Sequence, residues 1–242
     1  LIVILLTTSM TLFSAVFLLC VDVEAYYPTP SLPEWLQMQH NCMLRLIGYD
    51  PLNTMHFGGF PTGGSIHDIC TWSGIVCHHG YVQCITWAYD SGKNILYYWF
   101  PMHIRTVDFS QQNIGIPLVT RSLPQLLQKL RMEGCRISGE IDLTTLPSRL
   151  RELDVSWNEI SGAVSLLRLP ASLRQINLSA NSIRYVYGAD GCFPEGFERF
   201  FMNSHQVVPT YRSVDGSPID ERADIFYKGW VSAKVENMRK IR

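Results

Sequence analysis

The stretch LRELDVSWNEI, Leu150–Ile160, decides the fold of this chain. Apolar residues stand at its first, fourth, sixth and eleventh positions, and Asn158 stands at the ninth. The pattern recurs at a constant step of 23 residues, and two looser copies flank the series, starting at Val82 and Phe197. The four regular copies are Ile104–Ile114, Leu127–Ile137, Leu150–Ile160 and Leu173–Ile183. A fixed period of this length indicates stacked structural repeats.

Each copy predicts one coil of a solenoid, in which positions 3 to 5 form a short strand. Successive strands pair in parallel about 4.8 Å apart, and positions 1, 4, 6 and 11 point inward. Burying each inward side chain is worth about 1.5–3 kcal/mol, so the coils are stable only when stacked. Position 9 turns the chain, where an Asn side chain can bond backbone groups. Cys135 occupies this position in one coil, and we interpret it as a buried free thiol that fills space.

The spacing LxxLxLxxN/CxL resembles that of leucine-rich repeats (LRRs). The predicted fold is an α/β LRR solenoid, a short curved horseshoe with a parallel β-sheet on its concave face and an N-terminal helical cap. The other half of each coil also repeats, with Ser-Gly bends at residues 138–139 and 161–162 and Pro-containing turns at 147 and 170. These bends predict a thin convex side of irregular chain and short strands, without full helices.

Composition narrows the class of protein. Of the 242 residues, 47% are hydrophobic and 17% are charged, which excludes a mainly disordered chain. The formal net charge of −1 argues against a nucleic-acid binder, which normally carries a basic excess. Seven cysteines are enough for local disulfides but too few for a disulfide knot.

Residues 1–25 begin with a 20-residue apolar run without a charged side chain, followed by Val23 and Ala25 at suitable cleavage positions. We interpret them as a signal peptide, with an uncleaved signal anchor as the alternative. Both predict a secreted or cell-surface protein that meets a membrane only through this segment. The expected organisation is then an N-terminal LRR cap over 26–81, about five repeats over 82–206, and a C-terminal cap or tail over 207–242.

The N-terminal cap carries two signals. Ser31-Leu32-Pro33-Glu34 matches a capping box and predicts a helix that starts there and stops at Gly48. The later motif Cys70-Thr71-Trp72-Ser73-Gly74-Ile75-Val76-Cys77 resembles the CxWxGVxC of plant-type extracellular LRR proteins, with Ile in place of Val. The resemblance covers about residues 31 to 185 and implies a Cys70–Cys77 disulfide with Trp72 beneath it. The repeats themselves look closer to those of protozoan secreted or surface LRR proteins.

The cysteines and histidines of the cap leave alternatives open. Cys70, Cys77, His78, His79 and Cys84, with His67 and Cys42 nearby, could form a zinc cluster, although their spacing matches no CxxC framework. Cys42 and Cys84 could instead form a second disulfide, because the cap helix must lie over the first strand. Cys192 has no evident partner. We expect no metal and no cofactor.

Outward positions of the predicted concave strands are the candidate binding surface. They form a surface of mixed charge with an exposed Trp and Tyr, the residue types that anchor protein interfaces. The candidate residues are Arg105, Asp108, Gln111, Arg131, Glu133, Arg151, Asp154, Trp157 and Arg174. The structural alternative is that Asp108, Arg131 and Asp154 form a cross-strand charge ladder that only stabilises the sheet, and that Trp157 is an ordinary exposed aromatic residue.

Asn177-Leu178-Ser179 is the chain's only Asn-x-Ser/Thr sequon, and a glycan there would cover part of this surface. No catalytic motif stands out, so we expect a non-catalytic scaffold that binds a protein or glycan ligand through its concave face. Two other functions stay open: an inhibitor of a wall-degrading glycosidase, suggested by likeness to polygalacturonase inhibitors, and a structural coat or adhesion protein.

Overall fold

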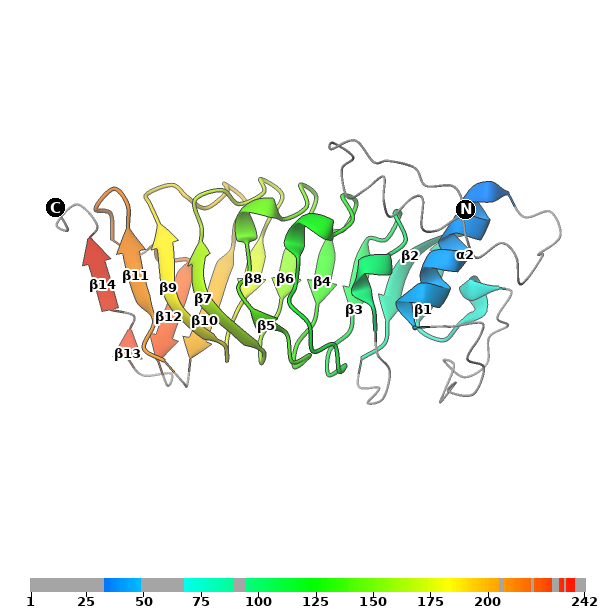
Figure 1. Cartoon of the computed structure of the whole chain (residues 1–242). Helices are drawn as coiled ribbons and strands as arrows, with labels where there is room; N and C mark the ends of the chain where they lie inside the picture. Colours follow the sequence, from blue (N-terminus) through cyan, green and yellow to red (C-terminus); the bar gives the residue numbers. More distant parts are fainter. Residues whose placement is uncertain are drawn as a thin grey trace, which may run out of the picture.

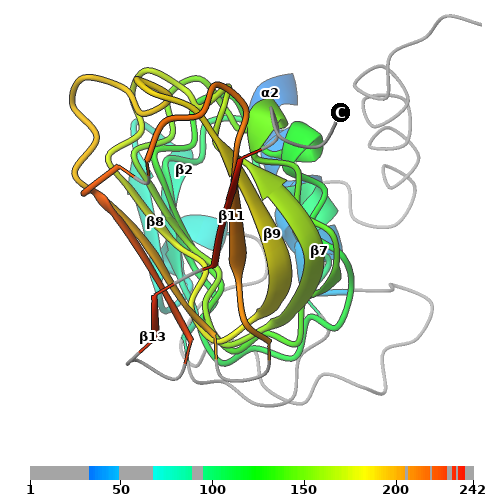
Figure 2. The same ribbon diagram turned by 90° about the vertical axis from the view of Figure 1, so that its left-hand side faces the viewer.

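The structure, a computed structural model, is a solenoid in which two β-sheets face each other (Figures 1 and 2). The buried apolar residues form one core cluster. It describes residues 33–48, 68–88, 95–204, 207–218, 220–227, 231–232 and 234–237. The proposed signal segment, residues 1–25, lies outside these ranges, as does His67. In the described residues, no helix is both long and apolar enough to cross a membrane.

The front sheet has nine strands and contains every predicted repeat strand. Its pairs are parallel except at the two ends, where β1 and β12 are antiparallel to β2 and β13 respectively. The strands in spatial order are β1 (Ile75–His78), β2 (Tyr81–Thr86), β3 (Thr106–Asp108), β4 (Lys129–Arg131), β6 (Glu152–Asp154), β8 (Gln175–Asn177), β10 (Arg199–Ser204), β12 (Ala223–Tyr227) and β13 (Val231–Ser232).

The 23-residue period is confirmed by the register. Leu130 pairs with Val107 on one side and with Leu153 on the other, one coil apart each time. The first residues of the four copies are all fully buried, in one file through the core: Ile104, Leu127, Leu150 and Leu173. The looser copy at Phe197 is also a true coil, because β10 pairs with β8 in the same register.

The back sheet differs from the irregular, short-stranded side that we predict. Its order is β14-β11-β9-β7-β5, and all of its pairs are parallel. The strands are β5 (Ser138–Gly139), β7 (Glu159–Ser165), β9 (Ser182–Gly188), β11 (Thr210–Ser213) and β14 (Lys234–Asn237). Two of them, β7 and β9, are seven residues long. In β7, buried Ile160 and Val164 flank half-buried Ser161 and Ala163, an alternation typical of a strand.

Short 3-10 helices supply the rest of the back side. They are η4 (Tyr97–Trp99), η5 (Thr120–Ser122) and η6 (Leu143–Thr145), whereas η3 (Ile69–Thr71) contacts β1 in the N-terminal cap. The back side therefore changes along the solenoid, from 3-10 turns in the early coils to regular strands in the later ones (Figure 1).

The segment after residue 206, which we expect to be a cap or tail, continues both sheets. Strand β11 adds to the back sheet beside β9, and β12 adds to the front sheet beside β10. Ile225 pairs with Met202, again 23 residues away, and is buried. The repeat therefore extends at least one coil beyond the predicted boundary at 206.

Helix α2 (Glu34–Leu46) forms the N-terminal cap. Pro33 is its N-cap, and Ser31, the first residue of the predicted capping box, lies outside the described residues. The predicted stop is confirmed by Gly48 at a φ of 67°. Buried Gln39 joins the helix to the front sheet. Its Nε2 donates to the Gly80 carbonyl at 2.9 Å, and its Oε1 accepts from the Val82 N–H at 2.8 Å.

Candidate front-face binding site

We define the front face as the outward-pointing side chains of the front sheet at repeat positions 2, 3, 5, 7 and 8. All nine predicted binding residues lie at these positions and keep at least part of their surface exposed. The adjoining inward positions are filled by the core, as with Val107, Leu130 and Leu153. Within the front sheet, the repeat therefore buries the inward side chains and leaves the outward ones accessible to a partner.

The position 5 carboxylates are held by their own turns. Asp108 Oδ1 accepts from the Ser110 N–H at 3.0 Å and from its hydroxyl at 2.7 Å. Asp154 Oδ1 accepts from Ser156 in the same way, at 3.1 and 2.6 Å. The side chain of Ser156 is nearly buried. This Asp-x-Ser arrangement orders the chain just after each strand.

The charge ladder suggested for position 5 does not form. Arg131 pairs in register with Asp108 and Asp154, but no ion pair within 4.0 Å joins these three described residues. The carboxylates face their serines instead. A cross-strand ion pair lies instead at position 3, where Lys129 Nζ is 2.5 Å from Glu152 Oε2, and the sequence pattern does not indicate it. Both partners are partly exposed, so the pair stabilises the sheet only modestly.

Position 8 adopts a left-handed backbone conformation in every regular coil. The φ angles are 65° at Gln111, 65° at Gly134, 55° at Trp157 and 55° at Ala180. The N–H of Trp157 donates to the Ser179 carbonyl of the next coil at 2.9 Å, which holds the conformation in place. Only glycine adopts this conformation without a steric cost. Gly134 is the one sequence signal that could have revealed it.

Trp157 is the most exposed large apolar residue of the part of the chain that the structure describes, at 63%. Its equivalents in the neighbouring coils are Gly134 and Ala180, which carry no side chain and a single methyl group. The same position therefore offers no bulky side chain on either side of the indole ring. A partner could reach this ring without displacing a neighbouring position 8 side chain.

Asn177, the residue of the sequon, lies at position 5 of β8. Its Oδ1 accepts from the Ser179 N–H at 3.1 Å, and its Nδ2 donates to Asp154 Oδ2 at 3.2 Å. The Asn177 amide therefore closes the same turn that Asp108 and Asp154 close in their own coils. Glycosylation of Asn177 stays a prediction.

The cap cysteines resolve two of the alternatives. Cys70 and Cys77 form the disulfide that the resemblance implies. Trp72, two residues after Cys70, is buried. A zinc cluster that uses both thiols is thereby excluded. The suggested Cys42–Cys84 bridge is not formed, because Cys84 is a free thiol whose Sγ lies 3.5 Å from Thr86 Oγ1. Among the described residues, no cluster of three His, Cys, Asp or Glu could hold a metal ion.

Cys135 is the buried free thiol that the repeat predicts. Its Sγ donates to the Phe109 carbonyl at 3.0 Å, one coil earlier. Burial raises the pKa of this thiol to about 11, so it stays protonated and unreactive at neutral pH. Its role is structural.

Several other groups have shifted pKa values for structural reasons. Burial raises the pKa of Tyr97, whose hydroxyl donates to the Pro117 carbonyl at 2.5 Å, and raises that of Tyr211 to about 12. Hydrogen bonds from Ser217 hold the pKa of the Asp215 carboxyl well below its usual range. These groups close turns and fill the core, and none of them offers a nucleophile paired with a base.

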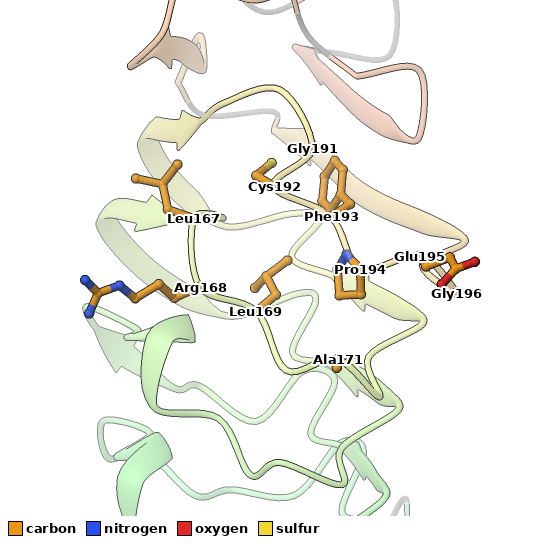
Figure 3. Close-up of a pocket in the computed structure, with 10 residues that line it drawn as sticks. All are labelled: Leu167, Arg168, Leu169, Ala171, Gly191, Cys192, Phe193, Pro194, Glu195 and Gly196. Atoms are coloured by element: carbon orange, nitrogen blue, oxygen red, sulfur yellow. The ribbon is translucent and has the colours of Figure 1, made fainter.

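One open depression lies away from the front face, where the chain returns from the back sheet (Figure 3). It has a volume of about 640 Å³ and is lined by Leu167, Leu169, Cys192 and Phe193, with Arg168 and Glu195 at its margins. Burial raises the pKa of the Cys192 thiol, which disfavours the reactive thiolate. The depression therefore lacks the features of a reactive site.

No protein-family model matches the chain, and no curated protein matches it in sequence. Among solved structures, the chain is similar to the LRR ectodomain of the receptor kinase SOBIR1 from Arabidopsis thaliana. The two are 20% identical, with a TM-score of 0.45 over 56% of this chain and 82% of that one. The coil period, the parallel register and the buried position 9 residues define this chain as an LRR-like β-solenoid.

Proposed function

We propose that this protein is a non-catalytic scaffold, secreted or held at the cell surface, that binds a protein partner through its front face. Trp157 carries the proposal. A left-handed conformation costs a non-glycine residue about 1–2 kcal/mol, and the 63% exposed indole recovers little of this by packing. A bulky aromatic side chain at such a site suits an interface anchor, because its apolar surface is buried only when a partner binds.

The arrangement of the coils supports this assignment. The inward side chains pack in the core, and the position 9 side chains bond to the backbone. The outward positions are therefore those at which the sequence can vary without loss of the fold. They carry arginines, carboxylates and one tryptophan, residue types that recognise proteins. The disulfide Cys70–Cys77 supports an oxidising compartment, in keeping with the signal segment proposed for residues 1–25.

Chemical cross-linking and capture from the native cell surface tests the function. The full chain is compared with a double variant, Trp157→Ala and Arg131→Glu, and with Arg184→Glu as a matched control. Arg184 is exposed on β9 of the back sheet, so the control changes one arginine on the opposite face.

We expect the double variant to lose captured proteins by about tenfold, as for a hot-spot residue, and the control to retain them. Equal capture by all three proteins would remove the front face as the binding site. Capture of further copies of this chain alone would favour the structural coat or adhesion function. Slowing of a polygalacturonase by the purified protein would favour the inhibitor function.

A further inference from the structure

The charge of the front face changes sign across the strands, and this indicates which way a partner lies. Building on the proposed function, we propose that the partner is a protein whose contact surface is itself polarised. Its acidic side lies over the entry edge of the front strands, and an apolar residue with neighbouring basic groups lies over the exit edge. The entry edge is position 2 with Arg149, and the exit edge is positions 5 to 8.

The entry edge is strongly cationic. Arg105, Arg151 and Arg174 occupy position 2 of their coils and are all exposed. Backbone hydrogen bonds keep this position in one row, as from the Arg174 N–H to the Arg151 carbonyl at 2.8 Å. Arg149, also exposed, adds a fourth guanidinium two residues before Arg151. Glu198, at position 2 of the next coil, is the one carboxylate described within ion-pair distance of these arginines, at 3.6 Å from Arg174.

Such a row is unfavourable for the isolated chain. Neighbouring strands lie about 4.8 Å apart. Arg151 and Arg174 therefore place like charges on adjacent coils of the row, and this destabilises the sheet slightly. An anionic partner reverses the sign of that contribution. Guanidinium groups also bind carboxylates in a two-pronged geometry that ammonium groups lack.

The exit edge has the opposite character. It contains three carboxylates, those of Asp108, Glu133 and Asp154, and one guanidinium, that of Arg131. Trp157 lies at position 8 of the coil that contains Asp154. Three residues of strand separate position 2 from position 5, which is about 10 Å. Between the two edges lies the Lys129–Glu152 ion pair, which is neutral as a unit.

This polarity favours a protein over a glycan. A polyanionic glycan on the arginines would lie about one Debye length, roughly 10 Å, from the carboxylates, which would repel it weakly because salt screens part of the interaction at that distance. A neutral glycan binds through hydroxyl and amide groups, and three of those on the front face already have partners. Ser110 and Ser156 donate to their aspartates, and Asn177 donates to Asp154. A protein surface can present both signs at this separation.

A peptide titration with the full chain tests the inference. The probe is a fluorescein-labelled peptide with four glutamates, a central Leu-Phe and four lysines, compared with decaglutamate and with a heparin oligosaccharide. One variant is Arg105→Glu with Arg151→Glu. The second is Asp108→Asn with Asp154→Asn, which keeps the turn because Asn177 already closes it in β8. Arg184→Glu is again the control.

We expect the polarised peptide to bind the wild-type chain most tightly, and each double variant to weaken it about tenfold. Added salt should weaken binding, and the control should bind as wild type does. Tighter binding of heparin would assign the row to glycans, and tighter binding of decaglutamate would remove the exit edge. No binding, or unchanged binding by both variants, would overturn the inference. Cell-surface capture that still depends on Trp157 would then leave the proposed function standing.

Discussion

Asn158 Oδ1 accepts the backbone N–H of Cys135, one coil earlier, at 2.9 Å. The same oxygen accepts from Ile137 at 2.9 Å, while Nδ2 donates to the Met132 carbonyl at 2.8 Å. This one buried side chain therefore joins two coils at the point where both turn. We predict that Asn158→Ala lowers the free energy of unfolding by about 3 kcal/mol or more, because it leaves several buried backbone groups without partners.

Denaturant unfolding followed by circular dichroism measures the loss. Asn113→Ala is the matched control, because Asn113 is exposed in its coil and its removal should change stability by less than about 0.5 kcal/mol. Equal effects of the two substitutions would contradict the role given to Asn158.

Much of this scaffold follows from the sequence because the inward positions repeat in exact register. A 23-residue step and a polar ninth position suffice to place Leu150 in the core and Asn158 in the turn. The back sheet is harder to predict, since the alternation in β7 is interrupted by Gly162 and the recurring Ser-Gly pair indicates a bend, although it lies within strands β5 and β7. Its strands depend on pairing with the next coil, which a local pattern does not reveal.

The front face divides in the same way. The outward positions could be predicted, but the contacts that their side chains make could not. Asp108 and Arg131 lie opposite each other, yet the Asp108 carboxylate accepts a local hydrogen bond from the Ser110 N–H instead of pairing with Arg131. The recurring Asp-x-Ser at positions 5 and 7 was the signal for this. Trp157 gave no local sign of its conformation, because the neighbouring coils impose it.

Trp157 should trade stability for binding. We predict that Trp157→Gly raises the free energy of unfolding by about 1 kcal/mol, because glycine adopts the left-handed conformation without steric cost. The same substitution should abolish cell-surface capture. Ala180→Gly is the control, since Ala180 has the same φ of 55° in the next coil. It should raise stability similarly and leave capture intact. Loss of stability in Trp157→Gly would show that the indole packs as a structural residue.

The Cys70–Cys77 disulfide should stabilise the N-terminal cap. The bridge closes a loop with a sequence separation of 7, for which the loss of chain entropy in the unfolded state gives about 2.5 kcal/mol. We predict that the double variant Cys70→Ala, Cys77→Ala is less stable by about that amount and that its cap opens before the coils do. Cys84→Ala, which removes a free thiol, should unfold at the wild-type denaturant concentration. Hydrogen exchange that rises equally throughout the solenoid would contradict a local role.

Asp215 should make the last described coils sensitive to acid. Its Oδ1 accepts from the Ser217 N–H at 2.9 Å and its Oδ2 accepts from the Asp190 N–H at 2.8 Å, so the folded chain favours the carboxylate and lowers its pKa. A lowered folded pKa contributes stability above the unfolded value of about 3.9, and this is lost as the pH falls further. We predict that unfolding measured from pH 6 to pH 2 shows a steeper loss in the wild type than in Asp215→Asn. Asp220, whose pKa is lowered mainly by a hydrogen bond from Arg222, keeps part of the dependence in the variant. Parallel curves for the two proteins would mean that the Asp215 turn also forms when the carboxyl is protonated.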